Sequence, residues 1–370
     1  MHGGIQDFTA KGIYNVLSAI CDLTAAIPVR MPSLTSVTLD FYPSDRYIPP
    51  IAPLLRSLPQ LSKIALPSFT DVSPILLALK SSTKLQRLCF NSGTPYNKAV
   101  EETWRQLGDS IFTAVEDLYI RVRQYSSIYP FFQEHPLQNL RVLTVLTIQN
   151  EEPSSVRNLF QIIPTFSPNL VELKVSYSHE SEFFEISVTP PEDEIVTFAD
   201  FRAVLACPNI TRFTLLHAYP LGLTDSDVEE IAIAWPRLRT LRLCNEGYLR
   251  RHWRLSSKPT LHALFTLIRH CPELEEVGLF MDTKPLSSAT LASLANTDTE
   301  FAMLKKLFLQ GSPPERQDTY RLAMSLSQFC HPSCTLEWME WNFTVDEEMT
   351  HSWRMVEEML AASTVPPTAR

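Results

Sequence analysis

Residues Leu223 to Leu243 have the sequence LTDSDVEEIAIAWPRLRTLRL, and this stretch decides the fold. Its first half has the charged start and apolar spacing of a short helix. Trp235-Pro236 ends that helix, because proline cannot continue it and biases the residue before it toward extended backbone. Leu238, Leu241 and Leu243 follow with the spacing Leu-x-x-Leu-x-Leu. Because the last two of these leucines are two residues apart, they share one face of a short strand.

The same triplet, with conservative swaps, recurs along almost the whole chain about every 30 residues. Helical patterns lie between the triplets, for example at Val72 to Lys80, Val100 to Ile111, Val156 to Ile163 and Leu261 to His270. Strands and helices therefore alternate throughout. The eleven triplets are Leu34/Val37/Leu39, Leu61/Ile64/Leu66, Leu85/Leu88/Phe90, Val115/Leu118/Ile120, Leu140/Leu143/Val145, Leu170/Leu173/Val175, Ile210/Phe213/Leu215, Leu238/Leu241/Leu243, Leu274/Val277/Leu279, Leu304/Leu307/Leu309 and, weakest, Leu336/Met339/Trp341.

A unit of one strand and one helix cannot bury its own apolar face, so the units must stack. The sequence therefore predicts an α/β leucine-rich-repeat solenoid, a horseshoe with parallel strands on the concave face and helices on the convex face. A doubly wound α/β domain is the alternative, since it also alternates strands with helices. That fold would want a Gly-x-Gly-x-x-Gly turn after an early strand, which this sequence lacks, and its strands would be less uniform.

The ends of the array need caps, because a terminal repeat otherwise exposes an apolar edge to water. We expect a helix from Phe8 to Leu23, with its apolar face at Ile13, Val16, Leu17 and Ile20. A helix from Asp346 to Ala361 is expected to close the other end. Within the array, Ser226 and Glu229 have the spacing of a capping box. The predicted organisation is an N-terminal capping region at 1–30, a repeat array of about eleven repeats at 31–345, a C-terminal capping helix at 346–362 and a flexible tail at 363–370.

Composition narrows the class of partner and the compartment. The net charge of −9 provides no general attraction for phosphate backbones or anionic membranes, so we expect neither nucleic acid nor membrane as a partner. No signal peptide or membrane-spanning apolar run is visible. The seven cysteines are an odd number without a Cys-x-x-Cys pair, as is typical of reduced core thiols. These features predict an intracellular protein of the cytoplasm or nucleus.

Motifs for catalysis are missing from the sequence: there is no Gly-x-Ser-x-Gly elbow, no His-Glu-x-x-His and no phosphate loop. We therefore expect no enzymatic activity, no cofactor and no metal. Cys330-His331-Pro332-Ser333-Cys334 is the nearest approach to a metal site, but it supplies at most three ligands without a second half. We interpret it as a structural element at the end of a helix.

Residues that alternate with the buried strand positions should point outward from the concave face. Tyrosine, tryptophan and arginine dominate protein interfaces, because they bury large areas and can pair charges bidentately. The alternative is an ordinary mixed surface, with the C-terminal aromatic residues covered by the last helix. The predicted outward positions include Lys63, Asp117, Glu172, Lys174, Glu276, Lys306 and Glu340. The predicted partner-binding residues are Arg87, Tyr119, Arg121, Arg212, Arg242, Phe280, Phe308 and Trp338.

Two charged stretches interrupt the regular pattern. The first is basic and suits an acidic or phosphorylated partner, because arginine matches carboxylate and phosphate geometry. The second is acidic and falls in the longest gap between triplets. Either stretch can also be a solvated loop without a binding role. The basic residues are Arg237, Arg239, Arg242, Arg250, Arg251 and Arg254, and the acidic residues are Glu180, Glu182, Glu185, Glu192, Asp193 and Glu194.

The repeat at Leu223 to Leu243 resembles that of F-box proteins with leucine-rich repeats, especially the fungal branch, in which helices end in Trp-Pro or Cys-Pro. Cys207-Pro208 and Cys271-Pro272 repeat this idiom, and the resemblance extends over residues 30 to 345. It implies that the repeats hold a protein substrate of a ubiquitin ligase while an F-box docks a Skp-type adaptor. No F-box pattern is visible, so the adaptor is expected only if an F-box is missing from this chain. A free-standing scaffold or inhibitor without a ubiquitin role is the alternative.

Overall fold

The structure of the chain is a computed structural model. It describes residues 6–11, 17–67, 69–92, 112–177, 191–245, 257–287, 304–309, 312, 314, 316–328, 330–337 and 347–363. The chain divides into two compact units, Met1–Ser178 and His179–Arg370. We describe each unit by itself, and call them unit 1 and unit 2.

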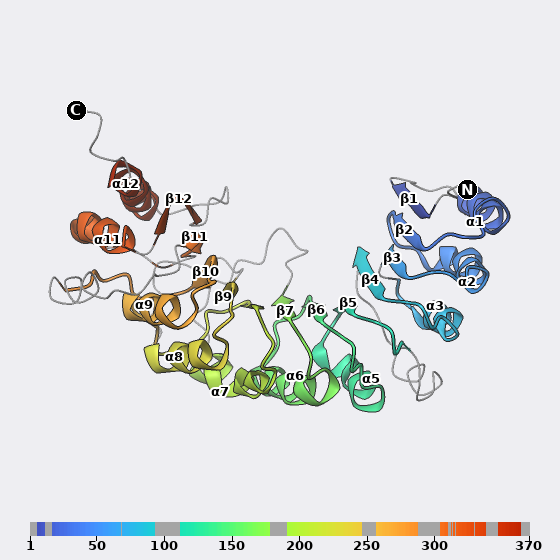
Figure 1. The fold of residues 1–370 in the computed structure, drawn as a ribbon, viewed down its shortest axis with the longest axis horizontal. Coiled ribbons are helices and arrows are strands. Elements are labelled where there is room, and N and C mark those ends of the chain that lie inside the picture. Colours follow the sequence, from blue (N-terminus) through green and yellow to red (C-terminus); the bar gives the residue numbers. More distant parts are fainter. Residues whose placement is uncertain are drawn as a thin grey trace. The chain divides into compact units, whose positions relative to one another are not determined.

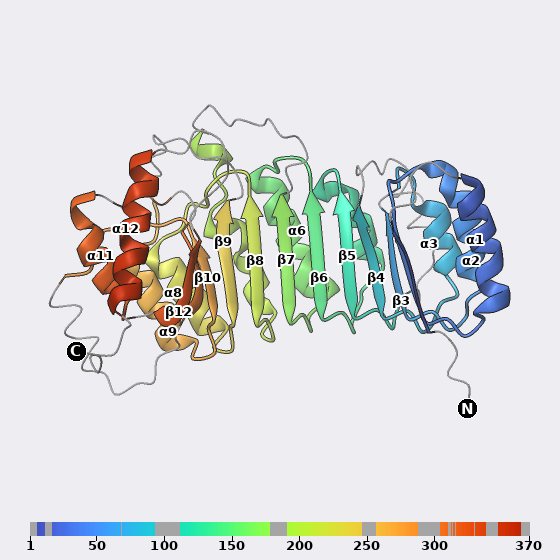
Figure 2. The same ribbon diagram turned by 90° about the horizontal axis from the view of Figure 1, so that it is seen from above.

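Unit 1 contains a parallel sheet in which each strand pairs with the next strand of the sequence (Figure 2). Its helices lie on one side of the strands (Figure 1). The strands are β1 (Asp7–Lys11), β2 (Ser36–Asp40), β3 (Lys63–Pro67), β4 (Arg87–Ser92), β5 (Asp117–Val122), β6 (Val142–Thr147) and β7 (Glu172–Tyr177). The helices are α1 (Leu17–Arg30), α2 (Ile48–Arg56), α3 (Ser73–Leu79), α5 (Tyr129–Glu134) and α6 (Pro153–Phe166).

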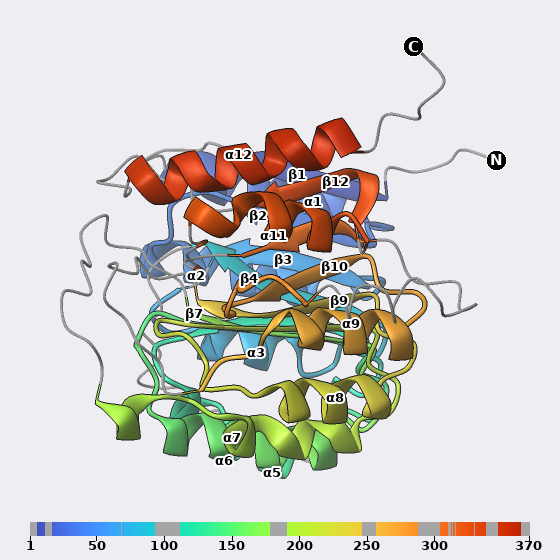
Figure 3. The same cartoon turned by 90° about the vertical axis from the view of Figure 1, so that its left-hand side faces the viewer.

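Unit 2 repeats this arrangement, again with parallel strands paired in chain order. Helices α11 and α12 pack against each other at its C-terminal end (Figure 3). The strands are β8 (Arg212–His217), β9 (Thr240–Asn245), β10 (Glu276–Leu279), β11 (Leu304–Phe308) and β12 (Cys330–Glu337). The helices are α7 (Phe198–Phe201), α8 (Asp225–Ala234), α9 (Leu261–His270), α11 (Thr319–Leu326) and α12 (Glu347–Ser363).

The apolar triplets form the core of every described repeat. Each residue of the first ten predicted triplets is at most 6% exposed, from Leu34 to Leu309. The predicted helices at Val72 to Lys80, Val156 to Ile163 and Leu261 to His270 correspond to α3, α6 and α9. The stretch Val100 to Ile111 lies outside the described residues. These features confirm the prediction of a leucine-rich-repeat solenoid.

Two repeats at the ends of the chain differ from the prediction. The register pairs Phe8 with Val37 and Ala10 with Leu39, so Asp7–Lys11 is an additional strand and not the start of a helix. The sequence Asp-Phe-Thr-Ala-Lys alternates only weakly between apolar and polar residues, so its pattern does not indicate a strand. At the other end Leu336 lies opposite Leu307, which makes it the second leucine of its triplet, whereas the prediction took it as the first.

The predicted N-terminal cap is described only in part. Ile20 is buried, Leu17 is 38% exposed, and Ile13 and Val16 lie outside the described residues. At the C-terminus α12 runs from Glu347 to Ser363 and buries Trp353, Val356 and Leu360. The indole of Trp353 donates to the carbonyl oxygen of Ser312 at 3.1 Å, which holds α12 against unit 2. The tail beyond Ser363 is outside the described part of the chain.

Within each unit a shared carbonyl joins consecutive repeats at most junctions. The carbonyl oxygen just before a strand accepts two successive N–H groups from the following repeat, at 2.7 to 3.2 Å. A carbonyl oxygen has two lone pairs, so one acceptor can serve both donors. At these junctions consecutive strands therefore start at the same level. The carbonyls are those of Gln6, Thr35, Ser62, Gln86, Glu116 and Arg141 in unit 1, and Thr211, Arg239 and Glu275 in unit 2.

Helix α8 starts with a capping box that differs from the predicted one. Thr224 is the N-cap, its hydroxyl accepts the N–H of Asp227, and the Asp227 carboxylate accepts the N–H of Thr224 at 2.8 Å. The prediction had placed this motif two residues later, at Ser226 and Glu229. Local spacing alone does not distinguish these registers, because both threonine and serine can cap a helix.

The helix ends of unit 2 form a buried ladder that explains the Cys-Pro and Trp-Pro idiom. Cys207, Trp235 and Cys271 each precede a proline, have left the helical backbone conformation and are almost fully buried. The indole of Trp235 donates to the carbonyl oxygen of Cys207 at 3.0 Å, and the thiol of Cys271 donates to that of Trp235 at 3.4 Å. Because proline disfavours helical backbone at the residue before it, the side chains of Trp235 and Cys271 can each satisfy a carbonyl of the preceding repeat.

We expect Trp235→Ala to lower the free energy of unfolding by about 3 to 5 kcal/mol, since it leaves a cavity and an unpaired buried carbonyl. Trp235→Phe should cost less, because a six-membered aromatic ring is retained and the cavity is smaller, although the hydrogen bond is lost as well. Urea denaturation followed by circular dichroism measures both changes. Ile233→Ala in the same helix is the control, because Ile233 is 60% exposed. Equal losses for Trp235→Ala and Ile233→Ala would contradict the ladder.

Candidate functional site

The strand face of unit 1 brings two of the predicted partner-binding residues together. Arg87 pairs with Asp117 in the register of β4 and β5, and Cys89 pairs with Tyr119 one step further along. The Nε of Arg87 donates to Oδ2 of Asp117 at 2.6 Å, with the two side chains 55% and 25% exposed. We call Arg87, Cys89, Asp117 and Tyr119 the Arg87–Tyr119 surface. It presents an arginine and a tyrosine on a rigid backbone ladder.

Burial keeps the thiol and the phenol of this surface neutral. It raises the pKa of Cys89 to about 11, and the carboxylate of Asp117 adds to this rise against the opposing effect of Arg87. The pKa of Tyr119 is also raised, first by burial and then by Cys89, while Arg121 lowers it. Neither group is therefore activated as a nucleophile. The surface offers hydrogen bonding, aromatic contact and the charge of an ion pair.

Arg121 lies on the same strand but differs from the prediction in exposure. It stands two residues beyond Tyr119, opposite Leu146 of β6, and is only 8% exposed. The expectation that it is available to a partner is wrong on this point. Strand alternation gives the direction of a side chain but not how closely the neighbouring side chains cover it.

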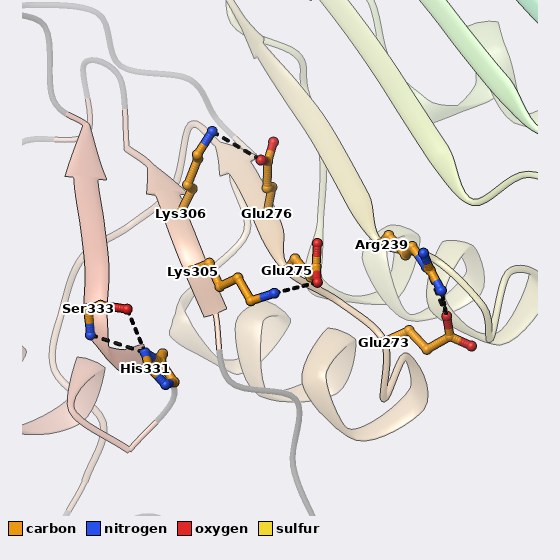
Figure 4. Close-up of polar contacts among 8 residues, drawn as sticks. All are labelled: Arg239, Glu273, Glu275, Glu276, Lys305, Lys306, His331 and Ser333. Carbon is orange, nitrogen blue, oxygen red and sulfur yellow. Dashed lines mark hydrogen bonds and ion pairs between the residues drawn. The ribbon is translucent and has the colours of Figure 1, made fainter.

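Ion pairs lie in a row at the N-terminal ends of strands β9, β10 and β11 in unit 2 (Figure 4). Arg239 pairs with Glu273, Lys305 with Glu275 and Lys306 with Glu276, at 2.5, 2.5 and 3.2 Å. The hydrogen bond from Lys305 lowers the pKa of Glu275, while the hydrogen bond to Glu273 raises the pKa of Arg239. These groups are largely exposed, so each pair contributes little to stability. They bring acidic and basic side chains into alternation along the strand starts.

Arg242 and Phe308 meet on the next level of unit 2. Both are in register with Gly278, which lies between them on β10. Because glycine has no side chain, the guanidinium reaches across β10 and lies 4.1 Å from the centroid of the Phe308 ring. This distance is within the range of a cation–π contact. Two predicted binding residues thus contact each other.

Phe308 and Phe280 do not form the exposed aromatic surface that the sequence predicted. They are 5% and 4% exposed, and Phe280 follows the end of β10. Lys258 lies near the Phe280 ring, with its Nζ 6.0 Å from the centroid. The prediction is therefore wrong in their exposure. Phe280 lies beyond the last residue of its strand, and Phe308, although within β11, is covered in part by Arg242.

The remaining candidates are placed as follows. Arg212 is exposed at the start of β8. Trp338 and Glu340 lie outside the described residues. In the basic stretch Arg237 is exposed, while Arg250, Arg251 and Arg254 lie outside the described part. In the acidic stretch Glu192, Asp193 and Glu194 form a short 3-10 helix. Glu180, Glu182 and Glu185 lie outside the described residues.

A buried carboxylate in unit 1 was missed from the sequence. Glu151 lies between β6 and α6 and is 6% exposed. Its carboxylate accepts the N–H of Tyr125 at 2.8 Å and the hydroxyl of Thr147 at 3.3 Å, so it joins the loops of adjacent repeats. Burial raises its pKa, and these hydrogen bonds oppose the rise. The available signal was a pair of acidic residues, Glu151 and Glu152, directly before Pro153, the first residue of a helix.

Two further findings concern the described part of the chain. No group of three or more His, Cys, Asp or Glu residues there has an arrangement that could hold a metal ion. No helix there combines the length and apolar character needed to cross a bilayer.

Comparisons with known proteins give a structural likeness without a sequence relative. No protein-family model matches the sequence, and no curated protein matches it. The internalin InlF from Listeria monocytogenes aligns over 91% of this chain and 82% of its own, with 13% identity and a TM-score of 0.41. A chain of the yeast Rad7 and Elc1 complex aligns over 91% of this chain and 81% of its own, with 12% identity and a TM-score of 0.41. The repeat architecture therefore rests on the register and the buried triplets.

Removal of the Glu151 charge should flatten the pH dependence of stability. A carboxyl whose folded pKa is raised favours folding fully below its unfolded pKa, and this contribution is lost as the pH rises through the folded pKa. Glu151→Gln retains an acceptor for Tyr125 but does not titrate. We expect its free energy of unfolding to fall less than that of the wild type as the pH rises from about 4.5 toward neutrality. Urea titrations across this range measure the slopes.

The control for that experiment is Glu152→Gln, which removes the exposed neighbouring charge. Glu151→Ala should lower the free energy of unfolding by about 2 kcal/mol, because buried donors lose their acceptor. Parallel pH curves for the wild type and Glu151→Gln would contradict the assigned role of burial.

The contact between Arg242 and Phe308 predicts a coupling of about 1 kcal/mol in a double-mutant cycle of Arg242→Met and Phe308→Leu. Methionine keeps an apolar side chain but removes the cation, and leucine keeps an apolar residue without a ring. Equilibrium unfolding of the four proteins gives the coupling. A second cycle with Arg212→Met in place of Arg242→Met should give none, since Arg212 is in register with Thr240 and not with Gly278. A coupling energy near zero in the first cycle would contradict a stabilising contact between Arg242 and Phe308.

Proposed function

We propose that this chain is a non-enzymatic protein-recognition array that binds its partner on the strand face, with the Arg87–Tyr119 surface as the contact in unit 1. The observation that supports this siting is the register of β4 and β5, in which Arg87 lies opposite Asp117 and Tyr119 lies opposite Cys89, so that the arginine and the tyrosine are diagonal neighbours on adjacent strands. A rigid sheet loses little conformational freedom when such side chains bind a partner.

The chemistry of this surface indicates the kind of partner group. The Arg87 guanidinium carries five N–H donors, of which Nε donates to Asp117. Tyr119 is half-buried and neutral, so its ring can pack against an apolar group while its hydroxyl forms a hydrogen bond. A protein segment with a carboxylate or phosphate next to an apolar side chain fits both residues.

A finer proposal concerns the biological role. We propose the substrate-binding part of an F-box-type ubiquitin-ligase receptor, on the strength of the repeat idiom at Leu223 to Leu243. We place the protein inside the cell, in the cytoplasm or nucleus, with no nucleic-acid or membrane partner, in keeping with its net charge of −9. A free-standing scaffold or inhibitor is the second candidate, because the same strand face can serve it equally well.

The test compares matched pairs of substitutions in unit 1. Arg87→Ala with Tyr119→Ala removes the Arg87–Tyr119 surface. Arg56→Ala with Tyr42→Ala removes the same residue types from exposed positions in α2 and after β2. Tagged proteins are used for capture from an extract of the source cells, with quantitative mass spectrometry. We expect at least one protein to be captured by the wild type and the control but reduced about tenfold or more by the first pair.

Unchanged capture by folded Arg87→Ala/Tyr119→Ala protein would overturn the siting, and circular dichroism establishes that the variant is folded. The role is tested by mixing the chain with a purified Skp-type adaptor and measuring co-elution. Co-elution with the adaptor would support the proposal of a ubiquitin-ligase receptor. Retained partner capture without adaptor binding would support the proposal of a free-standing scaffold.

A further inference from the structure

Strand β12 contains an irregularity that brings two cysteines to its base. Leu304 of β11 pairs with Cys330, and Lys306 pairs with Thr335. Two residue-to-residue steps along β11 therefore span the same height, about 7 Å, as five steps along β12. The excess chain, His331 to Cys334, must bulge out of the strand. The ends of this bulge, and with them the cysteines, lie close together.

Contacts inside the bulge hold this shape. Nδ1 of His331 accepts the N–H of Ser333 at 3.1 Å and lies 2.7 Å from the Ser333 hydroxyl oxygen (Figure 4). The thiol of Cys334 is 3.8 Å from the carbonyl oxygen of Thr335, the residue that ends the bulge. Both cysteines are free thiols. The register thus brings two free thiols near each other at the base of one strand.

The two thiols differ in exposure and acidity. Cys330 is 1% exposed, whereas Cys334 is partly exposed. Hydrogen bonding between the two thiols lowers the pKa of Cys334 and, together with burial, raises that of Cys330. Burial instead raises the pKa of Cys207 to about 11 and that of Cys271 to about 12. Among these described cysteines, only Cys334 combines access to solvent with a stabilised thiolate, as a reactive cysteine requires.

We propose that Cys330 and Cys334 form a reversible intramolecular disulfide by exchange with a low-molecular-weight disulfide such as oxidised glutathione. The Cys334 thiolate attacks one sulfur of oxidised glutathione, forms a mixed disulfide and releases one glutathione thiolate. Cys330 gives up its proton and attacks the Cys334 sulfur, which releases the second glutathione. The two protein thiols are oxidised and one glutathione disulfide is reduced to two thiols.

The bulge favours the second step over persistence of the mixed disulfide. A disulfide needs Cα atoms about 4.4 to 6.8 Å apart, and the register of β11 and β12 holds the ends of the bulge near this range. Because the register already brings the ends of the bulge together, closure needs little backbone movement. The reaction modifies a site apart from the Arg87–Tyr119 surface and does not depend on the proposed function.

The test uses the reduced full chain incubated with oxidised glutathione under native conditions, then denatured, alkylated and digested with trypsin. Cys330 and Cys334 are the only cysteines in the tryptic peptide Leu322 to Arg354. We expect this peptide to lose two hydrogen atoms and to escape alkylation, and reduced glutathione to reverse the change. The reaction should be on the order of tenfold faster than glutathione addition at the exposed Cys21.

Two variants separate the roles of the thiols. Cys330→Ser should accumulate glutathione on Cys334, because the resolving thiol is missing. Cys334→Ser should leave Cys330 reduced, because it is buried. The proposal is overturned if the wild-type peptide keeps both thiols, if it retains glutathione on Cys334 without closure, or if Cys330 is oxidised equally fast in Cys334→Ser. Because Cys334→Ser changes a partly exposed position, it keeps the test valid even if Cys330→Ser does not fold.

Discussion

The carbonyl oxygen shared between consecutive repeats is the interaction on which the rest of each unit depends. At nine described junctions, six in unit 1 and three in unit 2, the carbonyl just before a strand accepts two N–H groups from the next repeat and so sets the level at which the following strand starts. The buried triplets can then stack leucine on leucine, because their backbones are in register. The hydrophobic effect stabilises the stack, but it is non-directional and does not choose a register. The shared acceptor makes that choice at these junctions.

The helix side follows from the same constraint. Since consecutive strands start at one level, the helix ends also come into line, and the residue before each proline faces the repeat behind it. In unit 2 that residue is Cys207, Trp235 or Cys271, and Trp235 and Cys271 each donate to a carbonyl of the preceding repeat. In unit 1 the Glu151 carboxylate likewise links adjacent loops, because it accepts hydrogen bonds from Tyr125 and Thr147. These buried polar contacts complete the pairing of groups that have no access to water.

The strand face contains residues of two kinds that share one direction. Arg121, Phe280 and Phe308 are covered by neighbours, and Phe308 is covered in part by Arg242. Arg87 and Tyr119 remain accessible. This difference separates a side chain that stabilises the array from one that can contact another protein. The paired substitutions at Arg87 and Tyr119 therefore test binding and not folding, because they change accessible groups and leave the core intact.

The sequence by itself determined the repeat, the core and most of the strands. The triplet spacing and the prolines are local patterns, and ten of the eleven triplets are buried as predicted. It failed at the ends, where Asp7–Lys11 has little alternation and the bulge of β12 shifts the last triplet. Tertiary structure alone decided which outward residues are covered, that Gly278 lets Arg242 reach Phe308, and that the bulge of β12 brings Cys330 and Cys334 near each other. These properties arise between neighbouring strands, where coverage depends on residues about 30 or more positions away that no local pattern contains.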